Sequence, residues 1–268
     1  MSPSGLHINK PAVIIIIGLI STVIFWYSYT SKSTTEQVET VSESGNMAVT
    51  EAMMKIMKDE PVPKEQTKDA GEGISLVYRE VKPEGSKLDV LFLHGQAFEA
   101  KTWVSEPVFT LQLLNKVGYR AVALDLPAGD KWKSKKPEKM ENDVFLAKAI
   151  TSLGLTKPVI VSPSMSGGFS LPFLFKDPSK VQEKSRGFVP VAPVNTEKYL
   201  DQYKSAHIPT MIIYGETDAT LGKESLKNLK NLPNVTVIEE LKGAGHACYM
   251  NSSLEFNKKL VDFLQSLK

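Results

Sequence analysis

Ser164 lies on a predicted turn between an apolar run and a helix-like run, in the segment Ser162-Pro-Ser-Met-Ser166. A tight turn of this kind holds its central hydroxyl away from the backbone, and small side chains are needed two positions to either side so that strand and helix can approach each other. Ser162 and Ser166 meet that limit where glycines are usual, and Pro163 biases Ser162 to extended geometry. This nucleophile elbow predicts Ser164 as the nucleophile. A strand exit followed by a helix N-cap is the alternative.

A serine hydroxyl needs a neighbouring base to take its proton, and the chain has four histidines. His7 precedes an apolar N-terminal segment and His207 precedes a predicted strand. His246 lies in a glycine-rich loop after the last predicted strand, where it can project over the carboxyl ends of the strands. We therefore predict His246 as the base, with an exposed loop histidine as the alternative. His94, in the turn after another strand, is the rival, although its place favours a structural role.

The base in turn needs a carboxylate that fixes its tautomer. Asp218 lies just beyond a predicted strand and is the best candidate. Glu216 is the rival in the same loop, and either residue could instead cap the next helix. The chain order Ser164, Asp218, His246 is the order found in α/β-hydrolases.

The oxyanion of an acyl-transfer intermediate needs preorganised N–H donors. The residue after the nucleophile, Met165, supplies one in this architecture, and the loop after the strand that ends in Leu93-His-Gly95 supplies the other, predicted here as Gln96. Both roles belong to the main chain, so the two side chains are replaceable.

Strand-type and helix-type runs alternate through the C-terminal part of the chain. Several strand runs are almost entirely apolar, which is typical of strands buried on both faces of a parallel sheet. The pattern predicts one α/β domain, an α/β-hydrolase fold with a mostly parallel sheet of about seven strands flanked by helices. About 16 residues separate the strand ending near Pro193 from the one beginning near Thr210, so no large cap domain is expected. The predicted strands are 74–81, 88–93, 121–126, 159–162, 188–192, 211–214 and 235–239, and the predicted helices are 108–117, 142–153, 166–175, 222–232 and 254–267.

The N-terminal segment 12–27 has no charged residue and ends in an aromatic cluster. With two further residues it would span about 27 Å as a helix, near the lower limit for a membrane core. A cleaved signal peptide is the rival. The segment that follows is rich in Ser, Thr, Glu and Lys. We therefore expect a membrane anchor at 1–30, a flexible tether with one weak helix at 31–73, and a hydrolase domain at 74–268.

The charges around the predicted anchor indicate its orientation. Lys10 lies before the apolar segment, whereas Lys32 is soon followed by glutamates, so the positive-inside rule places the N-terminus in the cytosol. This predicts a single-pass type II membrane protein with a lumenal or extracellular hydrolase domain, and a cytosolic domain is the alternative. Two glycosylation sequons, at Asn234 and Asn251, fit the first placement.

The composition excludes several other classes of function. The 268 residues carry a net charge of +2, which gives no indication of a nucleic-acid partner. The single cysteine, Cys248, excludes an internal disulfide and is expected to be a buried apolar residue. No dinucleotide or phosphate-loop motif is present, so we predict that no cofactor is required, and we predict no metal site.

Several segments resemble the alpha/beta-hydrolase-domain-containing protein 14 family, and the N-terminal segment resembles its membrane-attached branch. The resemblance implies a Ser, Asp, His triad that maps onto Ser164, Asp218 and His246. In the soluble branch it implies hydrolysis of acyl esters and transfer of acetyl from lysine to coenzyme A. The segments are Leu93-His-Gly95, 118–127, 162–167, 187–193 and 242–249.

Together these patterns predict a membrane-anchored serine hydrolase that acts through an acyl-enzyme on a small-acyl ester or amide. Coenzyme A could serve as an acyl acceptor. A lysine cluster after the strand that ends near Leu126 is interpreted as a solvated charge run, and attraction of an anionic partner such as coenzyme A is the alternative. The competing hypothesis is a non-catalytic binding or signalling module that retains the fold. The cluster consists of Lys131, Lys133, Lys135, Lys136 and Lys139.

Overall fold

The computed structural model describes residues 53–55, 57–129 and 132–267. The chain divides into two units, 1–52 and 53–268, and only the second contains described residues. The anchor predicted at 1–30 therefore lies outside the described residues. Among the residues that are described, no helix has both the length and the apolar character needed to cross a membrane.

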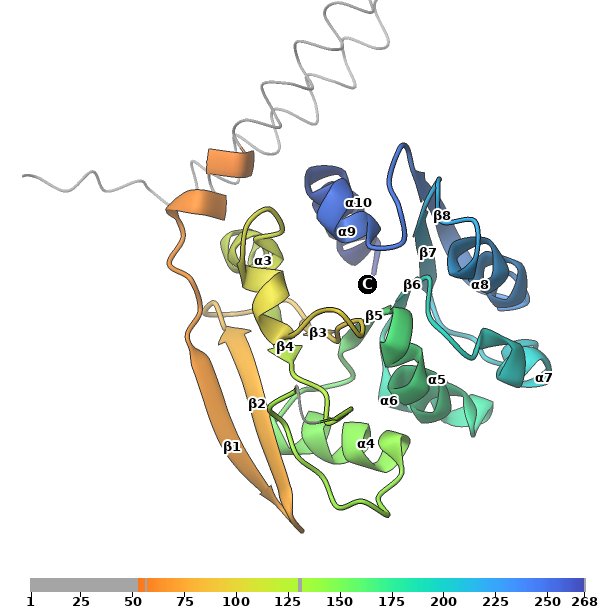
Figure 1. The fold of residues 1–268 in the computed structure, drawn as a ribbon, viewed down its shortest axis with the longest axis horizontal. Helices are drawn as coiled ribbons and strands as arrows, with labels where there is room; N and C mark the ends of the chain where they lie inside the picture. Colours follow the sequence, from red (N-terminus) through yellow and green to blue (C-terminus); the bar gives the residue numbers. More distant parts are fainter. Residues whose placement is uncertain (1–52, 56, 130–131, 268) are drawn as a thin grey trace, which may run out of the picture. The chain divides into compact units, whose positions relative to one another are not determined.

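An eight-stranded sheet forms the centre of the domain, in the order β1-β2-β4-β3-β5-β6-β7-β8 (Figure 1). Strands β1, β2 and β4 pair antiparallel, and every pairing from β4 through β8 is parallel. The prediction of a mostly parallel sheet is confirmed. The strands are β1 Glu65–Gly71, β2 Ile74–Val81, β3 Asp89–Phe92, β4 Arg120–Leu124, β5 Val159–Pro163, β6 Phe188–Val191, β7 Thr210–Gly215 and β8 Val235–Leu241.

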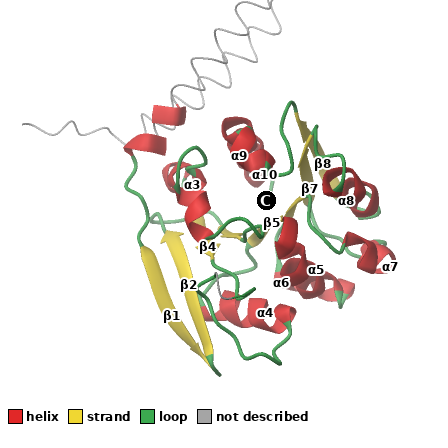
Figure 2. Cartoon of the chain, in the orientation of Figure 1, coloured by secondary structure: helices red, strands yellow, loops and turns green. Residues whose placement is uncertain are grey.

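Helices cover both faces of this sheet (Figure 2). One face packs against α4, α5, α6 and α8, and the other packs against α3 and α10. Neighbouring strand residues alternate between the two cores: Leu91 and Ile160 belong to the first, and Val90 and Val161 to the second. This explains why the strand runs are apolar throughout. The helices are α3 Thr110–Val117, α4 Asn142–Ser152, α5 Gly167–Phe175, α6 Val181–Lys184, α7 Leu200–Tyr203, α8 Leu221–Leu229, α9 Cys248–Asn251 and α10 Ser253–Ser266.

Strand β1 lies within the segment 31–73, where composition predicted a tether. It pairs with β2 through a tight turn in which Gly71, Glu72 and Gly73 all have positive φ. Nearly every β1 residue is exposed, so the strand lacks the alternation of apolar and polar residues that would have indicated it. A polar edge strand is a common way to prevent pairing between molecules.

The predicted weak helix is also part of the domain where it is described. Residues 57–59 are helical, and the Met57 side chain is only 1% exposed. The Nδ2 group of Asn257 in α10 donates a hydrogen bond to the Met57 sulfur at 3.5 Å. From Met57 onward the chain therefore packs on the hydrolase domain.

The connection between β6 and β7 is short. Residues 192–209 hold only a 3-10 turn and α7, so the expectation of no large cap is confirmed. Strands β3, β5, β7 and β8 all point the same way, and their carboxyl ends meet at one edge of the sheet. The loops at that edge carry Ser164, Asp218 and His246.

Candidate active site

Ser164 follows β5 directly and has a φ of +50°, in the left-handed region that side chains rarely adopt. This strain is typical of a nucleophile elbow. The helix α5 begins close to the loop after β6, where a Cβ on Gly167 would lie 2.4 Å from the Val194 carbonyl oxygen. Only glycine fits at that position. The chain therefore turns sharply at Ser164, as predicted from the small residues around it.

The two flanking serines bond within the elbow. Ser162 Oγ lies 2.9 Å from Ser166 Oγ and 2.6 Å from Ser170 Oγ, and all three side chains are buried. Ser166 Oγ–H also donates to the Pro163 carbonyl oxygen at 2.7 Å. Small serine side chains thus occupy the positions where glycines are usual, and their hydroxyl groups are satisfied by hydrogen bonds within the elbow. Ser164 is the partly exposed serine of the group.

Three side chains from separate loops form one chain of hydrogen bonds. Ser164 Oγ–H donates to His246 Nε2 at 2.8 Å, and His246 Nδ1–H donates to Asp218 Oδ2 at 2.6 Å. We assign this tautomer from the partners of the two nitrogens, because a carboxylate can only accept. The His246 side chain is 41% exposed and that of Asp218 only 2%. The structure thus brings together the three residues predicted from chain order.

The loops that carry Asp218 and His246 are joined by backbone contacts. Thr217 donates to the Ala244 carbonyl oxygen from both its N–H and its Oγ1, each at 2.9 Å. A Cβ on Gly215 would lie 2.1 Å from the Gly245 carbonyl oxygen, so the backbones approach as closely as glycine allows. This contact fixes the acid relative to the imidazole.

Glu216, the rival acid, has different partners. Its carboxylate accepts hydrogen bonds from the Lys242 ammonium group and from the Gly243 N–H, each at 2.9 Å. It therefore braces the loop that carries His246 from outside, and it does not contact the ring. Asp218 holds the position at the imidazole.

The Asp218 carboxylate is held in its ionised form by its surroundings. Burial alone would raise its pKa, but hydrogen bonds from His246 and from the Gly222 and Thr220 backbones outweigh that effect, and the pKa lies below its usual range. A Cβ on Gly222 would lie 3.0 Å from the Asp218 Cβ, so this close support also requires glycine. The negative charge can then stabilise an imidazolium.

Asn251 supports the same loop, a role that no motif in the sequence indicates. Its Oδ1 accepts a hydrogen bond from the Gly245 N–H at 3.0 Å, next to His246. From the sequence, Asn251 is predicted only to be a glycosylation site, as is Asn234. Both asparagines are exposed. Their glycosylation stays a prediction.

The loop after β3 passes directly beside the elbow. A Cβ on Gly95 would lie 3.4 Å from the Ser164 Cβ, and both Gly95 and Gln96 line the pocket that contains Ser164. Gln96 therefore lies at the pocket that contains the nucleophile, and Met165 directly follows Ser164 in the chain. The assignment of the Gln96 and Met165 N–H groups as oxyanion donors stays a prediction.

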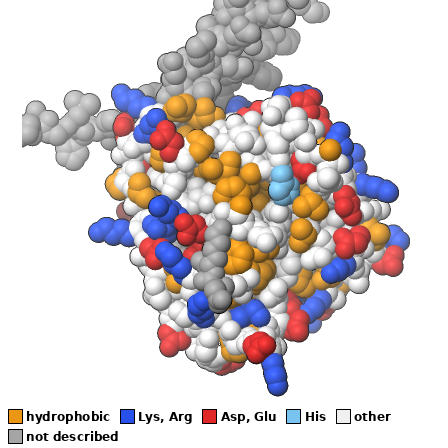
Figure 3. Space-filling model, in the orientation of Figure 1, with side chains coloured by type: hydrophobic (Ala, Val, Ile, Leu, Met, Phe, Trp, Pro, Cys, Tyr) orange, Lys and Arg blue, Asp and Glu red, His pale blue; other side chains and the backbone are white. Residues whose placement is uncertain are grey.

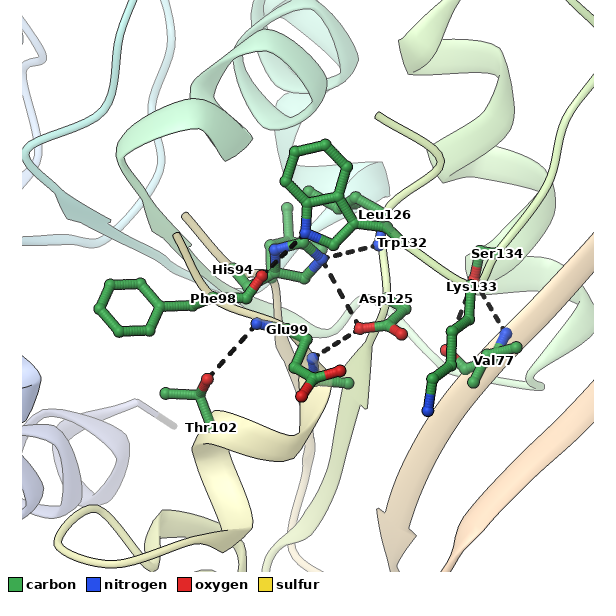
Figure 4. Close-up of polar contacts among 12 residues, drawn as sticks. Val77, His94, Phe98, Glu99, Thr102, Asp125, Leu126, Trp132, Lys133 and Ser134 are labelled. Carbon is green, nitrogen blue, oxygen red and sulfur yellow. Dashed lines mark hydrogen bonds and ion pairs between the residues drawn. The ribbon is translucent and has the colours of Figure 1, made fainter. Parts of the chain in front are cut away.

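His94 is enclosed beneath this loop (Figure 4). Its Nδ1 lies 3.0 Å from the Gly95 carbonyl oxygen, and its Nε2 accepts from the Leu126 N–H at 2.9 Å. Asp125 lies 3.8 Å from the ring and accepts from the Ala100 N–H at 2.6 Å. Both ring nitrogens are engaged by the main chain, which fits the predicted structural role.

Trp132 closes this network from the other side, and no motif in the sequence indicates this role. Its Nε1–H donates to the Phe98 carbonyl oxygen at 2.8 Å, and its ring lies 5.8 Å from that of His94 (Figure 4). The loop after β4 therefore holds the loop after β3 in place through side chains of both.

A pocket of about 290 Å³ opens at Ser164 and His246. Figure 3 shows a histidine at the surface of the molecule with hydrophobic side chains beside it. A larger pocket of about 410 Å³ lies against Gly167 and Gly168, has a mixed lysine and carboxylate lining, and contains none of the three linked residues. The pocket at Ser164 is lined by Gly95, Gln96, Ala97, Phe98, Pro163, Ser164, His246, Ala247 and Tyr249.

No family model matches the chain. Individual relatives do: Protein ABHD14A of Danio rerio is 45% identical over 202 residues, which cover 72% of this chain and 72% of that protein. The chain belongs to the ABHD14 family. A second relative in the family, of Homo sapiens, is named "Putative protein-lysine deacylase ABHD14B" and is 41% identical over 204 residues, which cover 74% of this chain and 93% of that protein.

Solved structures share the fold of this ABHD14 family member. A "predicted CIB-like hydrolase" from Thermoplasma acidophilum has a TM-score of 0.67 and 22% identity, covering 76% of this chain and 99% of that chain. At that identity the likeness concerns the fold alone. The predicted α/β-hydrolase fold is confirmed.

The lysines that could attract coenzyme A in this ABHD14 family member have other contacts. Lys133 pairs with Glu65 of β1 at 2.6 Å, and Lys135 and Lys136 donate to backbone carbonyl oxygens. Lys131 lies outside the described residues. No lysine is among the described residues that line the pocket at Ser164.

Cys248 lies two residues after His246 and is fully buried, as predicted. Burial raises the pKa of its thiol to about 12, so it stays protonated and is a poor nucleophile at neutral pH. The Cys248 thiol is therefore not a candidate nucleophile in this ABHD14 family member.

Proposed function

We propose that this ABHD14 family member is a serine hydrolase in which Ser164 is the nucleophile, His246 the general base and then acid, and Asp218 the group that orients and stabilises the imidazole. The observation that carries the proposal is the unbroken hydrogen-bond chain from Ser164 Oγ to Asp218, with links of 2.8 and 2.6 Å. Such a chain raises the nucleophilicity of a hydroxyl at neutral pH.

The reaction proceeds through an acyl-enzyme. Ser164 Oγ attacks the carbonyl carbon of the substrate while its proton passes to His246 Nε2, and the oxyanion accepts hydrogen bonds from the Met165 and Gln96 N–H groups. The carbon–oxygen or carbon–nitrogen bond to the leaving group then breaks, and His246 returns the proton to that group. In the second half, His246 activates a water or thiol that displaces Ser164 from the acyl group.

The substrate class is a small-acyl ester or amide. The pocket of about 290 Å³ at Ser164 is of a size for a short acyl chain. The name of the human ABHD14B relative, which gives a deacylase activity, supports an amide of lysine as one substrate type. Coenzyme A is proposed as an acceptor alongside water, and no cofactor is needed for either route.

We also propose that residues 1–30 anchor the protein in a membrane as a type II protein with a lumenal or extracellular hydrolase domain. The support is the charge-free segment 12–27 and the charge distribution around it. The exposed sequons at Asn234 and Asn251 are compatible with this placement. Enzymatic removal of N-glycans from the cell-expressed protein would then increase its gel mobility, and unchanged mobility of a fully membrane-bound protein would count against a lumenal domain.

A fluorophosphonate probe tests the proposed nucleophile, because it forms a covalent bond only with an activated serine. The wild-type protein is expected to be labelled and to hydrolyse p-nitrophenyl acetate, and Ser164→Ala is expected to lose both properties. Ser205→Ala, at an exposed serine on the β6–β7 connection, is the matched control and keeps both. Labelling that persists in Ser164→Ala would exclude Ser164 as the nucleophile.

A further inference from the structure

Tyr249 follows His246 by three residues, in α9, and its ring is only 2% exposed. The ring stacks on Trp103 with centroids 4.8 Å apart, and it meets Phe98 and Phe256 edge-on or tilted at 5.6 and 6.0 Å. Three aromatic neighbours therefore fix the direction of the ring, and with it the place of the hydroxyl.

The Tyr249 hydroxyl lies beside the nucleophile. The position of a Cβ on Gly95 is 3.8 Å from Tyr249 Oη, 3.4 Å from the Ser164 Cβ and 3.6 Å from the Phe98 ring. Ser164, the Phe98 ring and the Tyr249 hydroxyl therefore all lie close to the same side of Gly95. Tyr249 also lines the pocket at Ser164.

Within residues 57–129 and 132–267, no hydrogen bond engages the Tyr249 hydroxyl. Three side-chain polar atoms in the described residues are fully buried without a hydrogen-bond partner, and Tyr249 Oη is not one of them. The three are Arg79 Nε, Gln112 Oε1 and Tyr203 Oη. Tyr249 Oη is therefore reached from the pocket, whereas Tyr203 Oη is enclosed. A donor that is held rigidly and open only toward a pocket is placed to bond a ligand in it.

The hydroxyl keeps its proton at any pH at which the protein works. Burial raises the pKa of Tyr249 above its ordinary value. The pocket walls around it are largely apolar, formed by Phe98, Pro163 and Ala247. An acyl group with an oxygen beyond the reacting carbonyl would accept a hydrogen bond there, whereas a hydrocarbon chain would leave the hydroxyl without a partner.

The geometry points to Tyr249 as a specificity-determining residue whose hydroxyl donates to an oxygen on the acyl chain, so that the site favours oxygen-bearing acyl groups over hydrocarbon acyl groups of the same size. This inference rests on the proposed serine hydrolase function and narrows its substrate class. An ether, hydroxyl or keto oxygen supplies the same acceptor chemistry.

The test compares p-nitrophenyl methoxyacetate with p-nitrophenyl butyrate, whose acyl chains have the same number of heavy atoms. Tyr249→Phe keeps the ring and removes only the donor. We expect kcat/KM for methoxyacetate to fall about tenfold, the size of one hydrogen bond, while kcat/KM for butyrate stays unchanged. The difference in intrinsic reactivity between the two esters cancels, because each variant is compared with wild type on the same ester.

Tyr119→Phe is the matched control, since Tyr119 is an equally buried tyrosine that does not line the pocket. We expect it to leave both esters unaffected. Retained fluorophosphonate labelling and an unchanged Tm would show that Tyr249→Phe is folded with a reactive Ser164.

Two outcomes would overturn the inference alone, and in both the wild-type protein hydrolyses the two esters and Tyr249→Phe leaves its preference between them unchanged. Equal losses on both esters would indicate that Tyr249 donates to the oxyanion, and unchanged rates on both would show that its hydroxyl has no role. If the wild-type protein hydrolyses neither ester, the proposed function is overturned and the inference with it.

Discussion

His94 and His246 both follow a strand at the same edge of the sheet, and both have an aspartate nearby, yet their surroundings differ. The His246 side chain is 41% exposed, and its nitrogens face a hydroxyl and a carboxylate. The His94 side chain is 1% exposed, and both of its nitrogens face backbone groups. The chemical role of a histidine is therefore set by what its two nitrogens bond, and a nearby acid does not determine it.

The two aspartates show the same contrast. Asp218 Oδ2 lies 2.6 Å from an imidazole nitrogen, whereas Asp125 lies 3.8 Å from His94 and bonds the Ala100 N–H at 2.6 Å. Asp218 thus acts on a ring that can gain a proton, and Asp125 acts on the backbone of a loop. One aspartate thus bonds an imidazole that also contacts a serine hydroxyl, and the other holds the loop beside Ser164.

The largest effect is expected for His246→Ala. Without the base the ester hydrolysis rate should fall by about 10⁶-fold, because the triad acts as a unit. The melting temperature should change little, since this ring is partly exposed. Steady-state kinetics and thermal unfolding measure both quantities, and a rate within tenfold of wild type would contradict the comparison.

Asp218→Asn should reduce kcat by about 10⁴-fold, the size of this change in the best-studied triad, because the amide no longer enforces the productive tautomer. Asp125→Asn is the matched control. Its remaining Oδ1 can still accept from the Ala100 N–H, so we expect a kcat within about tenfold of wild type. Similar losses in the two variants would show that Asp125 also acts on the reaction.

His94→Ala should mainly lower the free energy of unfolding, whereas His246→Ala should mainly lower the hydrolysis rate. It leaves the buried Leu126 N–H without its partner, and we expect a loss of about 2 kcal/mol or more in the free energy of unfolding. The rate should fall by about 10- to 100-fold through the displaced loop. Urea unfolding, followed with hydrolysis assays on the folded fraction, would measure the two effects separately.

The contribution of Asp218 to the free energy of unfolding should depend on pH. Because the folded pKa of Asp218 lies below the ordinary value of 3.8, its contribution to stability is complete above that pH and is lost as the pH falls through the lowered pKa. The difference in unfolding free energy between wild type and Asp218→Asn should thus be constant near neutrality and shrink in acid. A difference that grows on acidification would contradict the assigned pKa.

The smallest effect is expected for Asn251→Ala, which removes the acceptor for the Gly245 N–H at an exposed position. We expect kcat to fall on the order of threefold, because the backbone group can bond water instead. Asn251→Asp keeps an acceptor and is the control that should retain the wild-type rate. A loss of kcat above a hundredfold in Asn251→Ala would show that this contact is essential for positioning His246.

Sequence reasoning identified the linked residues because each follows a strand whose end could be recognised. Ser164 is surrounded by small residues, and Asp218 and His246 fall in the expected chain order. The sequence favours Asp218 over Glu216, but both lie in one loop, and only the direction of each side chain separates them. The fold class followed in the same way from apolar strand runs.

Other features had no sequence signal of their own. Strand β1 is polar along nearly its whole length, so nothing in its pattern separates it from a tether. Trp132 and Asn251 act through contacts with Phe98 and Gly245, which depend on how separate loops pack. The open hydroxyl of Tyr249 depends on three aromatic neighbours drawn from different segments. Such roles arise from tertiary packing.

The short connection between β6 and β7 has a consequence for turnover. In the described part of the chain this connection holds no large cap over the strand ends, so an acyl group carried on a bulky partner could reach Ser164 without a prior rearrangement of the protein. The cycle would then lack a gate that opens and closes once per reaction. Solvent viscosity should slow the encounter of the two molecules but leave the maximal velocity untouched.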